Sequence, residues 1–222
     1  MINESLTLST LAAPALLSLL AVTGLIASDY HDVLGGRFVF KPLAAMAFIW
    51  LALIAGALDS GYGQVLLAGL LLAAAGDVFL MFESQGAFLA GLVSFLCGHL
   101  LYAVAFLQLP VHETGLLVST IPAAVLVVAS LYWLRGHLPG PMRFAVPVYM
   151  LVIAAMLIFA GGTWGQPAAL LILTGAWGFA FSDLSVARRQ FISTSPWNKL
   201  WGTPLYFGSQ MLLALSVAHY AA

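Results

Sequence analysis

Eight long apolar runs follow one another along the chain, and this feature limits its fold more than any other. Each run is close to the roughly 20 residues that an α-helix needs to cross a bilayer. Of the 222 residues, 63% are hydrophobic and only 7% are charged, whereas soluble domains are about one quarter charged. The expected spans cover residues 9–28, 39–58, 64–82, 87–109, 114–134, 143–160, 166–187 and 200–221.

The expected fold is therefore an all-α, polytopic integral membrane helix bundle with eight transmembrane helices, forming a single domain over residues 1–222. The first ten residues, MINESLTLST, lack the basic region of a cleaved signal peptide, so the first run is expected to remain as a span. A net charge of −1 gives no basic patch for nucleic acid, and the single Cys97 excludes an internal disulfide. Nothing in the sequence indicates an obligate protein partner.

The basic residues predict the orientation of the spans. All seven Lys and Arg lie at three of the breaks between runs, and eight alternating spans place these three breaks on one side of the membrane. The positive-inside rule makes that side cytoplasmic, with both termini outside. The loop-poor, Ala/Leu-rich chain is typical of a bacterial inner (plasma) membrane protein. The residues are Arg37, Lys41, Arg135, Arg143, Arg188, Arg189 and Lys199.

Two aspartates lie inside predicted spans. A carboxylate at membrane depth costs a few kcal/mol, so it usually faces a partner or a water-filled cavity. Asp77 and Asp183 are each expected about five residues before the cytoplasmic end of a span, or roughly 7 Å deep at the helical rise per residue. The two segments run in the same direction four spans apart, which suggests a duplicated four-span unit.

Further polar residues fall mostly in the cytoplasmic half of the spans, and together they predict a polar pocket that opens toward the cytosol or the inner leaflet. Each also has a structural interpretation. A single aspartate or histidine can be a satisfied polar contact, and Tyr and Gln often link helices by hydrogen bonds. Arg188 and Arg189 can serve as topology signals and lipid-phosphate contacts. The other candidates are Lys41, expected at the beginning of its span, His99, Tyr102, Tyr206 and Gln210, the last two on one helical stripe with Lys199.

A pair of carboxylates in different environments can act as a general acid and a general base. Such a pair suits hydrolysis of a lipid-borne bond, intramembrane aspartyl proteolysis or proton-coupled transport. The sequence contains no G-x-S-x-G, H-E-x-x-H or Walker motif. A catalytic zinc usually takes three protein ligands, and only His99 lies well inside a span near the aspartates, so neither a metal nor another cofactor is expected.

Several segments resemble the YhhN-like family of lysoplasmalogenases, in order and spacing from Lys41 to Gln210. The resemblance implies eight transmembrane helices around a polar site. It also implies an activity, the hydrolysis of the vinyl ether bond of lysoplasmalogens. The products would be a fatty aldehyde and glycerophosphoethanolamine or glycerophosphocholine. The substrate would be a lysophospholipid, and the other partners of the protein would be membrane lipids. The segments are KPL at 41–43, AAGDVFLMF at 74–82, FLCGHLLYAVAF at 95–106 and FAFSDLSVARRQF at 179–191, followed by Tyr206 and Gln210.

The resemblance places the family's polar signature on Lys41, Asp77, His99, Tyr102 and Asp183, and also on Tyr206 and Gln210. Vinyl ether hydrolysis begins with protonation of a carbon, so one aspartate is expected to act as the acid and the other as stabiliser and base. His99 or Tyr102 would orient water, Lys41 or Arg188 with Arg189 would hold the glycerophosphate, and the alkenyl chain would lie between helices. The alternative is a proton-coupled transporter, although Pro122 and Pro147, expected away from the aspartates, give no interrupted helix at the site.

Overall fold

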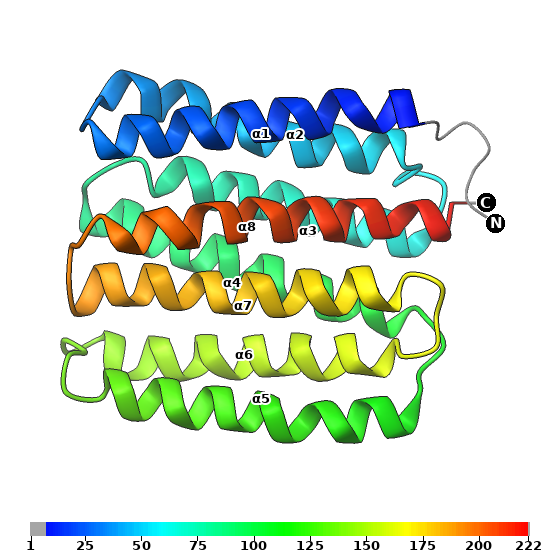
Figure 1. Ribbon diagram of the computed structural model, residues 1–222. Helices are drawn as coiled ribbons and strands as arrows, with labels where there is room; N and C mark the ends of the chain where they lie inside the picture. Colours follow the sequence, from blue (N-terminus) through cyan, green and yellow to red (C-terminus); the bar gives the residue numbers. More distant parts are fainter. Residues whose placement is uncertain (1–7, 222) are drawn as a thin grey trace.

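The computed structural model describes residues 8–221, and Figure 1 shows its elements in chain order. The expectation of an uncleaved amino terminus rests partly on residues 1–7, which lie outside the described residues. Over the described range the chain forms eight α-helices of 19–23 residues and no β-strand. The helices are α1 (Leu8–Tyr30), α2 (Leu34–Ile54), α3 (Gly61–Phe79), α4 (Gln85–Leu107), α5 (Glu113–Leu134), α6 (Met142–Gly162), α7 (Ala169–Phe191) and α8 (Trp197–Ser216), and a 3₁₀ turn, η1 (Val217–His219), follows α8.

The helices lie side by side and alternate in direction (Figure 1). The connections α1–α2, α3–α4, α5–α6 and α7–α8 therefore share one end of the bundle, which we call the basic end. All seven Lys and Arg lie in these connections or within about two helical turns of them. The three breaks that carry positive charge thus meet at one end, as the alternation of spans predicts.

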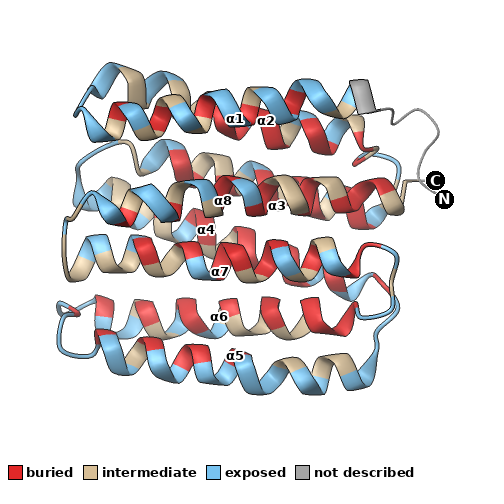
Figure 2. Cartoon of the chain, in the orientation of Figure 1, coloured by how far each residue is buried: buried red, intermediate tan, exposed pale blue. Residues whose placement is uncertain are grey.

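Seven helices, α1 to α7, are long and apolar enough to cross a membrane. The outer surface is also apolar, since side chains such as Leu20, Ile121 and Phe144 are 68%, 71% and 81% exposed. Buried residues instead follow the stripes where helices meet (Figure 2). The protein is therefore a multi-pass integral membrane helix bundle. Helix α8 is of similar length but more polar, because it carries inward-facing Asn198, Ser209 and Gln210.

Helix ends differ from the predicted spans by up to five residues. Helix α2 begins at Leu34 rather than at residue 39, so Lys41 lies seven residues inside the helix and not at its beginning. Helix α3 begins at Gly61 because Ser60 caps it, accepting a hydrogen bond from the backbone N–H of Gly63 at 3.1 Å. Apolar content cannot locate such ends, because a polar cap and the first helical turn fall outside the apolar run.

The two aspartates are not equally far from their helix ends, and that prediction was wrong. Asp77 lies two residues before Phe79, the last residue of α3, whereas Asp183 lies eight before Phe191, the last of α7. Helix α7 continues through Arg188 and Arg189, because cations are favourable in the last turn of a helix. Asp183 is consequently the deeper of the two along its own helix, by roughly 9 Å at the helical rise per residue.

Helices α1 and α2, α3 and α4, α5 and α6, and α7 and α8 form four closely packed antiparallel pairs. Further contacts join these pairs to one another: α8 lies against α1, α2 and α3, and α4 lies against α6. At the basic end, Asp29 of α1 accepts from Lys199 of α8 at 2.5 Å and pairs with Arg37 of α2 at 2.6 Å, so one carboxylate connects three helices.

Candidate active site

Asp77 is buried in α3 between two donors from different helices. The Nζ atom of Lys41 in α2 lies 3.2 Å from its Oδ1, and the hydroxyl of Tyr206 in α8 donates to its Oδ2 at 2.7 Å. The Asp77 side chain is only 4% exposed. Each carboxylate oxygen thus has its own donor, one of them cationic, which is the arrangement of a satisfied, ionised carboxylate.

Asp183 in α7 has a different set of partners. The hydroxyl of Tyr149 in α6 donates to its Oδ2 at 2.8 Å, and Nε2 of His99 in α4 lies 3.4 Å from the same oxygen. The side chain is 15% exposed, and no ion pair with Lys or Arg is formed by Asp183 in the described part of the chain. The two aspartates are therefore chemically distinct: one faces a fixed cation, and the other faces a phenol and an imidazole.

The hydrogen bonds of His99 determine where its protons lie. Its Nδ1 is 2.7 Å from the carbonyl oxygen of Phe95, and a carbonyl can only accept, so Nδ1 carries a hydrogen. In a neutral imidazole Nε2 is then an acceptor, and Nε2 has no well-formed hydrogen bond to any described residue. Nε2 lies 3.4 Å from Oδ2 of Asp183, and two acceptors would repel each other at this distance. The approach is therefore favourable only if one of the two atoms carries a hydrogen, either as a protonated carboxyl group or as a second N–H of His99.

Aromatic rings connect the two aspartates into one cluster. The ring of Phe179 is stacked on His99, with ring centroids 4.1 Å apart, and also contacts Tyr206 at 5.5 Å. Tyr102 in α4 donates to Oε1 of Gln210 in α8 at 2.6 Å. Chains of contact thus lead from Asp77 through Tyr206 and Phe179 to His99 and Asp183 inside the bundle.

The contacts of the two aspartates correspond between the two halves of the chain, α1–α4 and α5–α8. Each aspartate receives one donor from the preceding helix, Lys41 or Tyr149, and one contact from a helix of the other half. Asp77 of the first half is contacted by Tyr206 of α8, and Asp183 of the second half by His99 of α4. The matched residues lie 106 to 108 positions apart: Asp77 and Asp183, Lys41 and Tyr149, His99 and Tyr206, and Tyr102 and Gln210.

The remaining predicted residues lie outside the cluster. Arg188 donates to Oδ1 of Asn198 at 2.7 Å, a contact that fixes the α7–α8 connection. Arg189 is exposed. Lys199 shares a stripe of α8 with Tyr206 and Gln210, and it pairs with Asp29 of α1. The use of Arg188 and Arg189 as head-group ligands stays a prediction.

Tyr149 is the cluster residue that the sequence did not indicate. It lies in the apolar run PVPVYMLV and belongs to none of the segments that carry the family resemblance. Pro147, expected away from the aspartates, is only two residues from Tyr149 and so lies close to the site. Tyr149 lies seven residues inside α6, as Lys41 does inside α2, and this match became visible only once the helix ends were known.

No three His, Cys, Asp or Glu side chains between residues 8 and 221 come together in a way that could hold a metal ion. Asp183 and His99 form only a pair, and Cys97 lies apart as a free thiol. The side chains that the cluster offers for chemistry are thus two carboxyl groups, one imidazole, one amine and three phenols.

These features define a class: a polytopic membrane protein with two unlike carboxyl groups inside a helix bundle. A model of the YhhN family matches residues 36–217, and the chain belongs to the YhhN family. It is similar to two proteins named lysoplasmalogenase TMEM86A, from Bos taurus and Homo sapiens, with 35% identity over 158 and 156 residues, each covering 67% of this chain and 62% of the relative. It is also 32% identical over 196 residues to lysoplasmalogenase TMEM86B of Sus scrofa, covering 87% of this chain and 79% of that protein.

The chain thus spans about 62% of the length of the TMEM86A relatives. No solved structure matches it.

Proposed function

We propose that the protein is a membrane lysoplasmalogenase, which hydrolyses the vinyl ether bond of a lysophospholipid to a fatty aldehyde and the glycerophospho head group. The relatives' names and the family membership support the activity. The observation that carries it for this chain is the pair of unlike carboxyl groups, Asp77 with a cation and Asp183 with His99. Hydrolysis of a vinyl ether needs a proton donor and a negative charge that stabilises the resulting cation, and it does not need a serine-type nucleophile.

In this mechanism Asp183 and His99 supply the proton. The proton passes to the vinyl carbon that is not bonded to oxygen, and the carbon bonded to oxygen becomes part of an oxocarbenium ion. The negative charge of Asp77 stabilises this cation, as carboxylates do in glycoside hydrolysis. This assignment follows from the partners, because Asp77 accepts from two donors whereas the contact between Asp183 and His99 requires a shared proton.

Water then adds to the oxocarbenium carbon and gives up a proton to the Asp183–His99 pair, which restores the starting state. In the resulting hemiacetal the bond to the glycerol oxygen breaks, the hydroxyl group loses its proton to form the aldehyde carbonyl, and the glycerol oxygen gains a proton as it leaves. The net reaction consumes one water and needs no metal or redox partner. Tyr149 positions the acid in this scheme, and Tyr206 and Lys41 position the stabilising carboxylate.

The test is aldehyde release from 1-alkenyl lysophosphatidylethanolamine by the purified protein in detergent. Asp77→Asn and Asp183→Asn should each lower turnover by about 10²- to 10⁴-fold, the usual contribution of general acid–base groups. Asp59→Asn, an exposed aspartate at the opposite end of the bundle, is the matched control and should keep full activity. A folded wild-type protein without turnover would refute the function, and a fully active Asp77 or Asp183 variant would refute the mechanism.

Proton-coupled transport is the other function that the sequence allowed. Transporters often bind their substrates where two helices are interrupted at matching positions. Helices α3 and α7 run without a break through Asp77 and Asp183, which favours hydrolysis.

We further propose that α8 crosses the membrane with the other seven helices and that residues 1–222 form one domain. Helix α8 lies against α7 and α2, and its polar side chains Tyr206 and Gln210 face the interior rather than lipid. With eight spans the basic end faces the cytoplasm of a bacterial inner membrane, and both termini face outward. The site then lies between the cytoplasmic surface and the middle of the bilayer.

A further inference from the structure

An apolar groove runs along the surface of the bundle between α4 and α6. Its volume is about 270 Å³, just below the usual range of pockets that enclose a whole small ligand. It therefore has room for one segment of a ligand rather than for a complete phospholipid. The lining residues are Leu92, Val93 and Leu96 from α4, and Phe144, Ala145, Val148 and Tyr149 from α6.

The mouth of this groove faces the lipid. Val93, Phe144 and Val148 are 57%, 81% and 54% exposed, and they belong to helices that are apolar enough to span a membrane. The deeper side chains, Leu96 and Tyr149, are half-buried and buried. A hydrocarbon chain could thus enter the groove sideways from the bilayer without passing through water.

The groove leads to the candidate active site through Tyr149. The tyrosine side chain lines the groove, its hydroxyl donates to Asp183 at 2.8 Å, and its ring lies 5.4 Å from the ring of His99. A chain seated in the groove would therefore have its end beside the acid that the mechanism uses.

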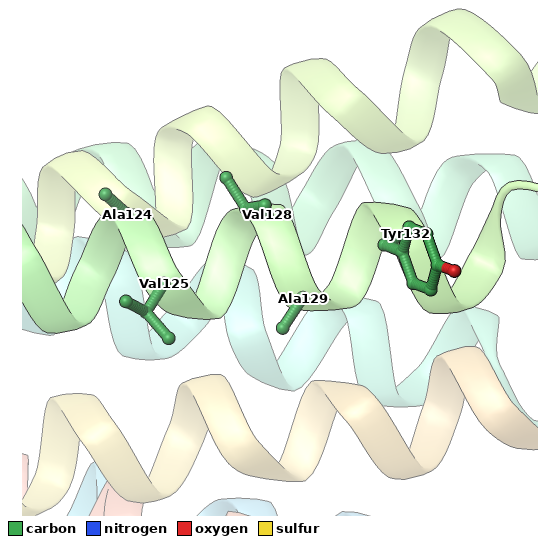
Figure 3. Close-up of a pocket in the computed structure, with 5 residues that line it drawn as sticks. All are labelled: Ala124, Val125, Val128, Ala129 and Tyr132. Carbon is green, nitrogen blue, oxygen red and sulfur yellow. The ribbon is translucent and has the colours of Figure 1, made fainter.

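A second surface hollow provides a contrast. It is lined by Ala124, Val125, Val128, Ala129 and Tyr132, all from α5, and Figure 3 shows their side chains spaced along that one helix. None of these five residues contacts an aspartate of the site in the described structure. The α5 hollow is thus an apolar surface like that of the α4–α6 groove, but it has no connection to the candidate active site.

We propose that the α4–α6 groove binds the single hydrocarbon chain of the lysophospholipid substrate, with the reacting end of the chain at Tyr149 and Asp183. This inference rests on the proposed function for the identity of the reacting bond. It assigns a position to the hydrocarbon chain beside Asp183.

The test fills the groove and measures both turnover and binding. Val148→Trp and Ala145→Phe should raise KM for a long-chain 1-alkenyl lysophosphatidylethanolamine at least fivefold and change kcat less than threefold. A short-chain analogue, which does not reach along the groove, should keep its KM within twofold. The matched controls Val128→Trp and Ala124→Phe, in the α5 hollow, should behave like wild type.

Binding of a non-hydrolysable 1-alkyl lysophosphatidylethanolamine, measured by competition with a fluorescent lysolipid, separates this inference from the proposed function. Suppose that wild type releases no aldehyde but Val148→Trp still weakens binding of the long-chain analogue. This result would support the groove as the binding site of the chain and would refute the vinyl ether activity. If Val148→Trp affects short and long chains equally, or no more than Val128→Trp does, the groove is not the chain site. Melting temperatures in detergent identify any variant that has simply lost its fold.

Discussion

Tyr149 shows how a residue inside an apolar run can belong to a reaction site. Its phenol donates to Asp183, so it holds the carboxyl group in one orientation toward His99. A buried carboxyl group that lost this donor would keep its surroundings but gain rotational freedom. Tyr149 is therefore expected to act by positioning Asp183.

Replacing Tyr149 with Phe removes the hydroxyl and preserves the ring that lines the groove. A neutral hydrogen bond contributes about 0.5–1.5 kcal/mol, so kcat should fall by up to about tenfold while KM stays near the wild-type value. Steady-state kinetics of aldehyde release provide the measurement. Tyr132→Phe, an exposed tyrosine of α5, is the control, and full activity of Tyr149→Phe would contradict the positioning role.

At this scale the sequence predicted both aspartates and three of the residues that contact them, but it did not predict Tyr149 or which partner belongs to which aspartate. A carboxylate in a span stands out because its cost in lipid demands compensation. Tyr149 does not stand out, because an uncharged phenol carries no such cost. In the proposed mechanism the aspartate that holds the proton is identified from the atoms that each carboxyl group contacts. The spacing of residues along the chain does not reveal these contacts.

Close helix packing beside Asp77 depends on a glycine. A Cβ atom added at Gly76 would lie only 2.7 Å from the ring of Phe95, and that ring is itself held against Phe179 and Tyr206. The small residue beside Asp77 thus lets α3 and α4 approach closely. The ring that it accommodates could be identified only from the packed helices.

Gly76→Ala should therefore destabilise the bundle by about 1–3 kcal/mol, the usual cost of overpacking, and displace Tyr206 from Asp77. Gly208→Ala in α8 is the matched control, because nothing lies within 4 Å of its added Cβ. That variant should be neutral or more stable by up to about 1 kcal/mol, since Ala is the better helix former. Thermal unfolding in detergent distinguishes the two, and equal melting temperatures would show that Phe95 can move aside.

Helix number and order were well predicted, and helix ends less well. Apolar runs of about 20 residues are a strong signal because the bilayer sets their length. The ends depend on caps such as Ser60 and Ser84, each of which accepts from a backbone N–H three residues ahead. Helix α8 is less apolar than α1 to α7, because the polar side chains that it turns toward the interior lower its hydropathy.

The whole molecule has one end rich in cations and one without them. This distribution predicts that the basic end faces the cytoplasm and that the α4–α5 connection faces outward. Both sides offer exposed positions for labelling, Gly136 after α5 at the basic end and Glu113 at the start of α5.

The orientation can be measured by cysteine labelling in intact cells after Cys97→Ser removes the native thiol. Glu113→Cys should react with a membrane-impermeant maleimide, and Gly136→Cys should react only after the membrane is made permeable. The opposite pattern would invert the topology, and labelling of both positions from outside would contradict an odd number of crossings between them.

Each aspartate is contacted by residues from both halves of the molecule, α1–α4 and α5–α8. One donor comes from its own half and one partner comes from the other half. A four-helix ancestor could thus have completed such a site only by pairing with a second copy of itself, giving two identical carboxyl groups across a symmetry axis. Fusion of the copies into one chain would have freed each group to change alone. Where one half now has Lys41 and the other Tyr149, a symmetric pair could have become an ion pair on one side and a proton donor on the other.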